Sequence, residues 1–505
     1  MKEKGIDVEL TAQVLNNFNN GKYDSVRPIS VESLPEVDGK RIIDIRGAFE
    51  WRCNKAAALE NLHSVNPSLA IDEVGRNEGD DLVLSRSDLH TIGEMLLPYV
   101  SYGILNGGSA TSYVDEKKNN GYLSKLYEEK QELFQRLAEN VGGKSKGITS
   151  GFVQPDGSPG PSFIELKMRN LLIQALRYNT RYGTASLQPV FPMFQMTSIR
   201  NNDEIAAAYT EFGKSPYLKP LIDITNIDIT DVRTGIQPLL AAYTHSEEGR
   251  PKFVFTRAYG KKDEILPLPG GHGQNFFVLA DVYRELLAMG KRFVYLTNVD
   301  NLGSTVDPVE VAMLALSGRQ AGFDFSYKTP VDVKGGILVR DTNYGLTTGD
   351  IGPAISKKDV AEKEAAGKEI LFNCGTGLFN LTALVNRLDQ IARELPVRFS
   401  DQNKDAGKYS QAEQVTWEVQ GMLNDFLGFA VDKNQRFLAS KLLLENFLTS
   451  GIGIDYVEAA AFRQVAENLH TGLKNKLKDD YGMKLDGGKW VPKTATELTA
   501  QAGLE

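Results

Sequence analysis

Short apolar runs alternate with amphipathic helical segments through the middle of the chain. Residues 292–298, RFVYLTN, are almost all apolar, which is typical of a strand buried on both faces. Residues 99–106, YVSYGILN, predict a similar strand, and Ser162 with Glu165 predicts a capped helix that follows it. This order of strand, helix and strand favours an α/β fold with a mostly parallel sheet, whose ligands bind at the carboxyl ends of the strands.

The two ends of the chain carry a different pattern. Residues 1–98 and 397–505 show mainly helical periodicity, whereas the strand and helix alternation is confined to residues 99–396. We therefore expect a central catalytic domain over 99–396, an N-terminal helical accessory region and a C-terminal helical region.

Composition narrows the functional classes. The 505 residues include 57 Lys and Arg against 65 Asp and Glu, a formal net charge of −8, with the basic residues scattered along the chain. This distribution argues against nucleic-acid or anionic-lipid partners. Only Cys53 and Cys374 are present, and no apolar run reaches membrane-spanning length, so we expect a cytoplasmic protein in a reducing compartment with no membrane contact.

Four places offer candidate chemistry. Gly107 and Gly108 follow a predicted strand, where the absence of Cβ atoms lets backbone N–H groups approach a phosphate or a base. Lys146 lies in a Gly- and Ser-rich loop, from which it could reach a phosphate. Glycines flank His272, which leaves room for a ligand. Asp300 follows a buried strand, where a carboxylate suits a divalent cation. A tight turn, a solvated lysine, a core histidine and a helix cap are the structural alternatives for these features.

Seven segments taken in order over roughly residues 100–450 resemble the UTP:glucose-1-phosphate uridylyltransferase family. The matching positions are Leu105, Asn106, Gly107, Gly108 and Thr111; Met196, Thr197 and Ser198; Gly271, His272 and Gly273; Asp300, Asn301, Leu302, Gly303 and Thr305; Lys328, Thr329, Asp332, Val333, Lys334, Gly335 and Gly336; Phe372 and Asn373; and Arg436, Phe437, Leu438 and Lys441. Asn380 matches a further family position.

The resemblance implies a Rossmann-like, glycosyltransferase-A-type mixed sheet that joins UTP and a sugar 1-phosphate into UDP-sugar and pyrophosphate. It implies Mg²⁺ as the cofactor, with Asp300 as its ligand, and Lys146, Lys441 and Lys334 as catalytic cations. The implied substrate-binding residues are Leu105, Gly107, Gly108, Thr111, Met196, Ser198, Gly271, His272, Asn301, Gly303, Lys328, Asn373 and Asn380. In-line attack on the α-phosphate needs positioning and charge neutralisation but no protein nucleophile.

The chain also departs from the family pattern. Ala110 replaces a glycine, Ser112 and Thr382 replace residues that are usually larger or basic, and about 30 residues are inserted before Lys146. No match is evident for the glutamine that contacts uracil in this family. The resemblance favours glucose 1-phosphate as the sugar, because DNLG, DVKGG and RFxxxK look more like that branch of the family. The alternatives are a UDP-N-acetylglucosamine or broad UDP-sugar pyrophosphorylase and a catalytically silent nucleotide-sugar sensor, and the oligomeric state stays open.

Overall fold

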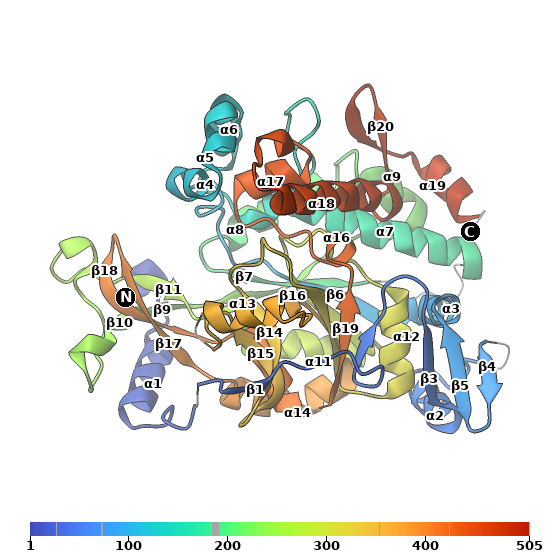
Figure 1. Ribbon diagram of the computed structural model, residues 1–505, viewed down its shortest axis with the longest axis horizontal. Helices are drawn as coiled ribbons and strands as arrows, with labels where there is room; N and C mark the ends of the chain where they lie inside the picture. The colour runs from blue at the N-terminus through green and yellow to red at the C-terminus, as the bar shows by residue number, and fades with distance from the viewer. Residues whose placement is uncertain (27, 72–73, 184–190, 353, 424, 504–505) are drawn as a thin grey trace.

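The computed structural model describes residues 1–26, 28–71, 74–183, 191–352, 354–423 and 425–503 (Figure 1). These residues form a large mixed sheet whose main path runs in the order β2 (Ile42–Asp44), β19 (Phe426–Val431), β13 (Ala321–Tyr327), β16 (Leu371–Asn380), β12 (Phe293–Asn298), β6 (Val100–Leu105), β7 (Met193–Ser198) and β8 (Arg233–Gln237). The sheet continues from β16 through β14 (Gly336–Asp341) to β15 (Gly345–Asp350) and β1 (Val31–Ser33).

Most neighbouring strands of the main path are parallel. Strands β12, β6, β7 and β8 run in one direction, as do β13, β19 and β2, and β16 lies antiparallel between the two groups. The expected α/β class with a mixed, mostly parallel sheet is therefore confirmed. The carboxyl ends of β12, β6, β7 and β8 meet at one edge of the sheet, and β16 brings its beginning to that edge.

Helices cover both faces of the sheet. The alternating side chains of β12 show why: Phe293 and Tyr295 belong to the core under one layer, and Val294 and Leu296 to the core under the other. The first layer contains α7 (Phe163–Tyr182), α12 (Pro308–Ser317), α3 (Arg86–Leu96) and α18 (Ala460–Asp479). The second layer contains α10 (Asn275–Val278), α11 (Ala280–Ala288) and α14 (Leu381–Glu394). Figure 1 shows α7 and α18 above the sheet and α14 below it.

The N-terminal region is more mixed than the sequence pattern predicts. It contains α1 (Val8–Asn19) and α2 (Lys55–Val65), but also a small sheet of β3 (Glu50–Asn54), β5 (Asp81–Ser85) and β4 (Arg76–Glu78). Strands β1 and β2 join the central sheet. Strands of three residues carry too little periodicity to be recognised, and tertiary pairing supplies their stability.

The C-terminal region also contributes to the central sheet. Strand β19 lies between β2 and β13, so the central sheet contains strands from both sides of the expected boundary at residue 396. Strands β17 (Arg398–Lys404) and β18 (Gly407–Glu413) form an arm with β10 (Tyr243–Thr244), at the left of Figure 1. The C-terminal region also contains the helices α17 (Leu443–Thr449), α18 and α19 (Ala495–Ala502).

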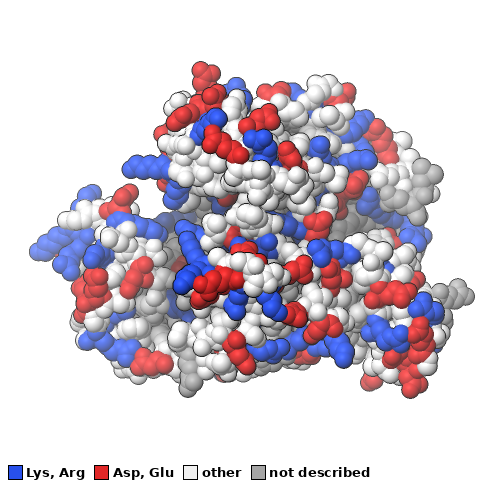
Figure 2. Space-filling model, in the orientation of Figure 1, with Lys and Arg blue, Asp and Glu red and all other residues white. Residues whose placement is uncertain are grey.

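After β6 the chain makes a helical excursion that packs against α17. The excursion consists of the short helices α4 (Glu116–Tyr122), α5 (Ser124–Glu129) and α6 (Gln131–Val141). The other helices and strands are α8 (Asn202–Phe212), α9 (Lys219–Thr225), α13 (Lys357–Ala365), α15 (Val419–Leu423), α16 (Lys433–Arg436), β9 (Leu239–Ala241), β11 (Pro267–Pro269), β20 (Met483–Asp486) and β21 (Lys489–Pro492). Over the face in Figure 2, acidic and basic side chains are largely interspersed. None of the helices among the described residues has the length and apolar character needed to span a bilayer.

Candidate functional site

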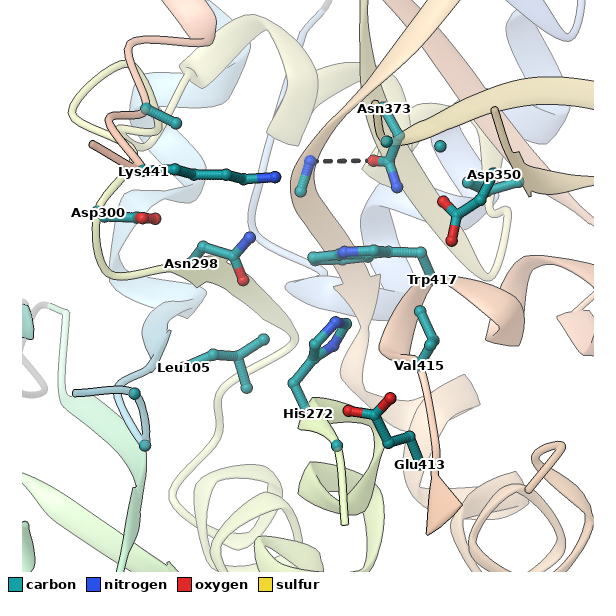
Figure 3. Close-up of a pocket in the computed structure, with 18 of the residues that line it drawn as sticks. Leu105, His272, Asn298, Asp300, Asp350, Asn373, Glu413, Val415, Trp417 and Lys441 are labelled. Atoms are coloured by element: carbon teal, nitrogen blue, oxygen red, sulfur yellow. Dashed lines mark hydrogen bonds between the residues drawn. The ribbon is translucent and has the colours of Figure 1, made fainter. Parts of the chain in front are cut away.

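A cavity of about 810 Å³ opens at the edge where the parallel strands end (Figure 3). Its lining comes from the ends of β6, β7, β8 and β12, the start of β16, and the segment that follows α16. Ten of the residues expected at the site line it: Leu105, Gly107, Gly108, Lys146, Met196, Gly271, His272, Asp300, Asn373 and Lys441.

The glycine loop after β6 lies directly beside Lys146 despite the long insertion between them. The backbone N–H of Lys146 donates to the Gly108 carbonyl at 3.1 Å, and Ser109 pairs with Ser145 as an isolated antiparallel bridge. The helical excursion therefore leaves and returns at the same point. A Cβ on Gly108 would meet nothing within 4 Å, so its backbone faces open space.

Ala110 does not project into the cavity. It is fully buried in the core of the helical excursion, and its N–H donates to the Lys144 carbonyl at 3.0 Å. The extra Cβ relative to the family pattern is thus accommodated by packing and leaves the ligand side of the loop unchanged.

Lys146 presents a buried ammonium to the cavity. The residue is 8% exposed, its Nζ has no hydrogen-bond partner among the described residues, and it lies 3.0 Å from the centroid of the Tyr113 ring. Burial lowers the Lys146 pKa to about 7, while the carboxylates of Asp300 and Glu445 oppose that shift. An anion bound nearby would supply the missing partner for this cation.

Asp300 and Lys441 reach the cavity from two segments that pair with each other. Leu302 N–H donates to the Leu438 carbonyl at 3.1 Å, and Asn301 forms a bridge with Ala439. Figure 3 shows the Asp300 and Lys441 side chains on the same side of the cavity. Among the described residues, neither the Asp300 carboxylate nor the Lys441 ammonium has a hydrogen-bond or ion-pair partner.

His272 is held as a neutral ring. Its Nδ1 accepts the backbone N–H of Thr416 at 3.1 Å, which requires the proton of the neutral ring to be on Nε2. Burial, and secondarily the charge of Lys441, lowers the His272 pKa to about 4. His272 therefore acts as a hydrogen-bond donor through Nε2 over the physiological pH range.

The opposite end of the cavity is acidic. Asp350, Glu413 and Glu418 line it together with Arg398, which pairs with Glu418. Burial raises the pKa of all three carboxyl groups. In Figure 3 the ring of Trp417, which is 6% exposed, lies between His272 and Asp350, whereas Glu413 is on the His272 side of the ring.

Asn373 is oriented by the beginning of β16. Its Oδ1 accepts the N–H of Gly375 at 2.9 Å, the dashed line in Figure 3, across a turn in which Gly375 has φ +62°. The left-handed backbone there suits glycine. The Asn373 amide group is thereby fixed at the cavity wall.

Seven other residues expected at the site do not line the cavity. Asn301 is completely buried, and its side chain binds backbone groups of Gly303, Cys374, Arg436 and Leu438. Gly303 packs so closely on the backbone of residues 436–437 that a Cβ would lie 2.4 Å from the Arg436 carbonyl carbon. These motif positions build the loop that carries Asp300.

The remaining five have local partners or lie elsewhere. Ser198 donates to Asn201, Lys328 pairs with Glu364 at 2.7 Å, and Thr111 is exposed beside Ser109. Asn380 caps α14 at the opposite end of the sheet, because β16 runs antiparallel to β12. Lys334 is exposed, although the next two residues, Gly335 and Gly336, line the cavity.

The cavity is also lined by residues that the sequence pattern did not predict. Gln237 ends β8, and a Cβ on Gly107 would lie 3.2 Å from its Oε1. It occupies the region in which the family's uracil-contacting glutamine had no evident match. Gln237 and Asn298 both end strands of the parallel sheet, so their positions carried a usable signal. No comparable pattern marks Asp350, Glu413, Trp417 or Glu418.

The donor set can accommodate Mg²⁺ only with help from a substrate. The described residues contain no group of three or more His, Cys, Asp or Glu side chains placed to hold a metal ion. Asp300 supplies one uncommitted carboxylate, and Mg²⁺ commonly takes one or two protein carboxylates together with substrate phosphates and water. The residues present therefore fit a substrate-dependent magnesium site.

Comparisons with known proteins agree with this architecture. Residues 252–451 match the family model described as UTP–glucose-1-phosphate uridylyltransferase. The protein of that name from Astragalus penduliflorus is 24% identical over 302 residues, which cover 58% of each chain. The protein of that name from Pyrus pyrifolia is 24% identical over 393 residues, covering 71% of this chain and 78% of the relative.

Among solved structures, the UDP-glucose phosphorylase from Trypanosoma brucei superposes with a TM-score of 0.54 at 17% identity. The match covers 89% of this chain and 76% of that protein, and it supports the fold. Together, the family match, the named relatives and the shared fold confirm the resemblance of this chain to the UTP–glucose-1-phosphate uridylyltransferase family.

Proposed function

We propose that this protein is a Mg²⁺-dependent uridylyltransferase that converts UTP and glucose 1-phosphate into UDP-glucose and pyrophosphate. The observation that carries the proposal is the meeting of Asp300, Lys441 and the unpartnered ammonium of Lys146 at one cavity beside a glycine loop. Such a set of charges suits phosphate groups. The family of the named relatives supports the same activity.

In the proposed complex, the uracil base lies beside Leu105, Gly107 and Gln237, where backbone and side-chain amide groups can form hydrogen bonds to the edge of the base. The triphosphate extends toward Lys146 and Lys441. Asp300 would hold Mg²⁺, which when bound neutralises charge on the phosphates. The sugar lies toward Asn373 and Asp350, on the far side of the cavity.

The reaction requires no covalent intermediate with the protein. An oxygen of the sugar phosphate forms a bond to the α-phosphorus of UTP, and the bond from that phosphorus to the bridging oxygen of the β-phosphate breaks. Pyrophosphate leaves with the electron pair. Lys146 and Lys441 stabilise the negative charge that builds on the phosphate oxygens, and His272 donates a hydrogen bond through Nε2.

The sugar end of the cavity favours a hydroxyl-rich hexose over an N-acetylated one. Asp350 and Glu418 offer carboxylate oxygens, which accept hydrogen bonds from hydroxyl groups, and Asn373 offers its Nδ2 group as a donor because its Oδ1 already accepts the Gly375 N–H. An acetyl methyl group placed among these oxygens would gain little contact and would desolvate them. Gly303 and Asn380, two of the substrate-binding residues that the resemblance implies, do not line the cavity.

The deciding experiment measures pyrophosphate release from UTP and Mg²⁺ with glucose 1-phosphate, galactose 1-phosphate and N-acetylglucosamine 1-phosphate in parallel. We expect release with glucose 1-phosphate above the other two. A preference for N-acetylglucosamine 1-phosphate would reassign the substrate. Binding of UTP or UDP-glucose by calorimetry without turnover of any of the three sugars would identify the protein as a nucleotide-sugar sensor.

A further inference from the structure

Buried side chains that take no part in the proposed reaction donate hydrogen bonds to the turn that follows Asp300. Residues 301–305 form this turn, and four of its carbonyl oxygens accept hydrogen bonds from side-chain donors. Two of the donors, Lys167 and Arg436, are cations that are 5% exposed or less. Burying two cations under a short turn is costly unless their hydrogen bonds are complete.

Lys167 has that complete set. It projects from α7, is 2% exposed, and its Nζ donates to the carbonyls of Asn301 at 2.8 Å and Ser304 at 3.2 Å. Its third donor reaches the Tyr102 hydroxyl at 3.1 Å, and that hydroxyl donates to the Ser304 carbonyl at 2.5 Å. An ammonium group has three N–H donors: here two bind the turn directly, and the third binds the Tyr102 hydroxyl, which itself donates to the turn.

The other contacts fix the rest of the turn. The Tyr481 hydroxyl donates to the Leu302 carbonyl at 2.6 Å, and Arg436 Nη1 donates to the Thr305 carbonyl at 2.9 Å. Lys476 Nζ donates to the Thr305 hydroxyl at 3.1 Å. Arg436 also pairs with Glu310 and Asp324, both almost completely buried, so its own position is fixed.

We propose that Lys167 is a positioning residue for the proposed reaction: it holds the turn at residues 301–305 so that Asp300 faces the phosphate end of the cavity. The inference rests on the proposed function of Asp300, because it concerns how that carboxylate is presented. Lys167 does not line the cavity and acts through the turn. A charged donor to backbone carbonyls in a buried setting gives a stronger and more directional restraint than a neutral one.

The matched control is Lys291. It is also buried, at 1% exposure, and its Nζ donates to the Pro98 carbonyl at 2.6 Å. It lies just before β12, whereas Asp300 follows the end of that strand. Lys167→Met and Lys291→Met each remove a buried ammonium that binds main-chain carbonyls, but only the first one touches the turn.

The experiment compares UTP binding by calorimetry with and without Mg²⁺, together with turnover, for wild type, Lys167→Met, Lys167→Arg and Lys291→Met. We expect Lys167→Met to lose most of the tightening of UTP binding by Mg²⁺, while binding without Mg²⁺ changes by less than about threefold. Its kcat should fall by about 100-fold with a smaller change in KM, because a displaced ligand costs most in the transition state.

Lys167→Arg should recover part of both effects, since a guanidinium can still donate to the turn, and Lys291→Met should keep the wild-type Mg²⁺ response. Equal loss of the Mg²⁺ response in Lys167→Met and Lys291→Met would overturn the positioning role and indicate general destabilisation. An unchanged Mg²⁺ response in folded Lys167→Met would also overturn it. If wild type itself shows no Mg²⁺ effect, the proposed metal function of Asp300 fails first.

Discussion

The two ends of the cavity differ in the charged side chains that line them. At the phosphate end, the ammonium groups of Lys146 and Lys441 lack hydrogen-bond partners among the described residues. At the sugar end, Asp350, Glu413 and Glu418 share the cavity with Arg398, which pairs with Glu418. A chain with a net charge of −8 thus places two lysines beside the Asp300 carboxylate where phosphates are proposed to bind, and keeps acceptors where hydroxyl groups are proposed to bind.

Lys146 combines burial with the lack of a hydrogen-bond partner among the described residues, which distinguishes it from the paired Glu418. A buried ion that has a partner contributes to structure, whereas one held without a partner costs free energy that a ligand can recover. Lys328 illustrates the converse, since the sequence suggested a substrate contact but the side chain pairs with Glu364.

The strongest test removes the acidic group at the phosphate end. We expect Asp300→Asn to lower kcat by about 1,000-fold or more, because the change removes the carboxylate that is proposed to hold Mg²⁺. Initial rates of pyrophosphate release measure the effect. Asp281→Asn, at a position whose side chain is 99% exposed in α11, is the control and should be silent. Comparable activity in Asp300→Asn and wild type would remove Asp300 from the metal role.

Removing Lys146 should separate activity from stability. Lys146→Met is expected to lower kcat by about 100-fold, in the range seen when one charge-stabilising donor is lost. The same change should raise unfolding free energy by about 1 kcal/mol, since it removes a buried ammonium that lacks a hydrogen-bond partner. Lys441→Met should lower kcat similarly without the gain in stability, because Lys441 is exposed. Denaturant unfolding and steady-state kinetics together measure both parts, and a destabilised Lys146→Met would contradict the comparison.

The acidic end should govern which sugars are accepted. Glu418→Gln is expected to raise KM for glucose 1-phosphate by about tenfold and to relax discrimination against a sugar 1-phosphate that carries a carboxylate at C6. Like charges at this end should make the wild type reject that acidic sugar. Competition between the two sugar phosphates measures the ratio. Equal use of both by the wild type would show that the acidic end does not face the sugar.

The smallest expected effect is a pH dependence of binding at the phosphate end. With its pKa lowered to about 7, Lys146 is charged below that pH and must take up a proton to pair with phosphate above it. UTP affinity should therefore fall by up to about tenfold per pH unit above about pH 7.5, where UTP itself is fully ionised. Asp300 and Glu445 are the charged groups that act on Lys146, and Tyr113 lies against it.

Two measurements check this dependence. Calorimetry should show proton uptake on UTP binding in wild type and a flat response in Lys146→Met. His272, with a pKa of about 4, stays neutral throughout. The unfolded chain binds more protons than the folded one between the folded pKa near 7 and the ordinary lysine value of 10.5, so the Lys146 contribution makes stability rise with pH in that interval. A pH-independent UTP affinity would contradict the low Lys146 pKa.

The sheet class and part of the candidate site could be predicted, because the end of an apolar strand is recognisable from the neighbouring residues in the sequence. RFVYLTN placed Asp300 at the carboxyl end of a buried strand, and the structure puts it at the cavity. Asn301 and Gly303 belong to the same motif but serve the packing of the turn, a distinction that only tertiary contacts reveal. The acidic end comes from β15, β18 and the residues after β18, which meet only through long-range pairing.

The place of β19 in the central sheet was harder to predict, because it also depends on long-range pairing. The run FLGFAV is apolar, yet it lies among helical segments, and its place between β2 and β13 depends on partners about 100 and almost 400 residues away in the chain. The insertion after Ser112 separates the glycine loop from Lys146 in sequence but not in space, because closing a longer loop adds little free energy.

The pairing of Ser109 with Ser145 also has a mechanical consequence. Because the excursion α4–α6 begins and ends at that one pairing, and its core is shared with α17, any displacement of these helices acts on Gly108 and Lys146 together. Gly108 and Lys146 are thus held in place by the same pairing. The 24 residues of α4, α5 and α6 can therefore change in length while this pairing keeps the spacing between the two groups that are proposed to contact the nucleotide.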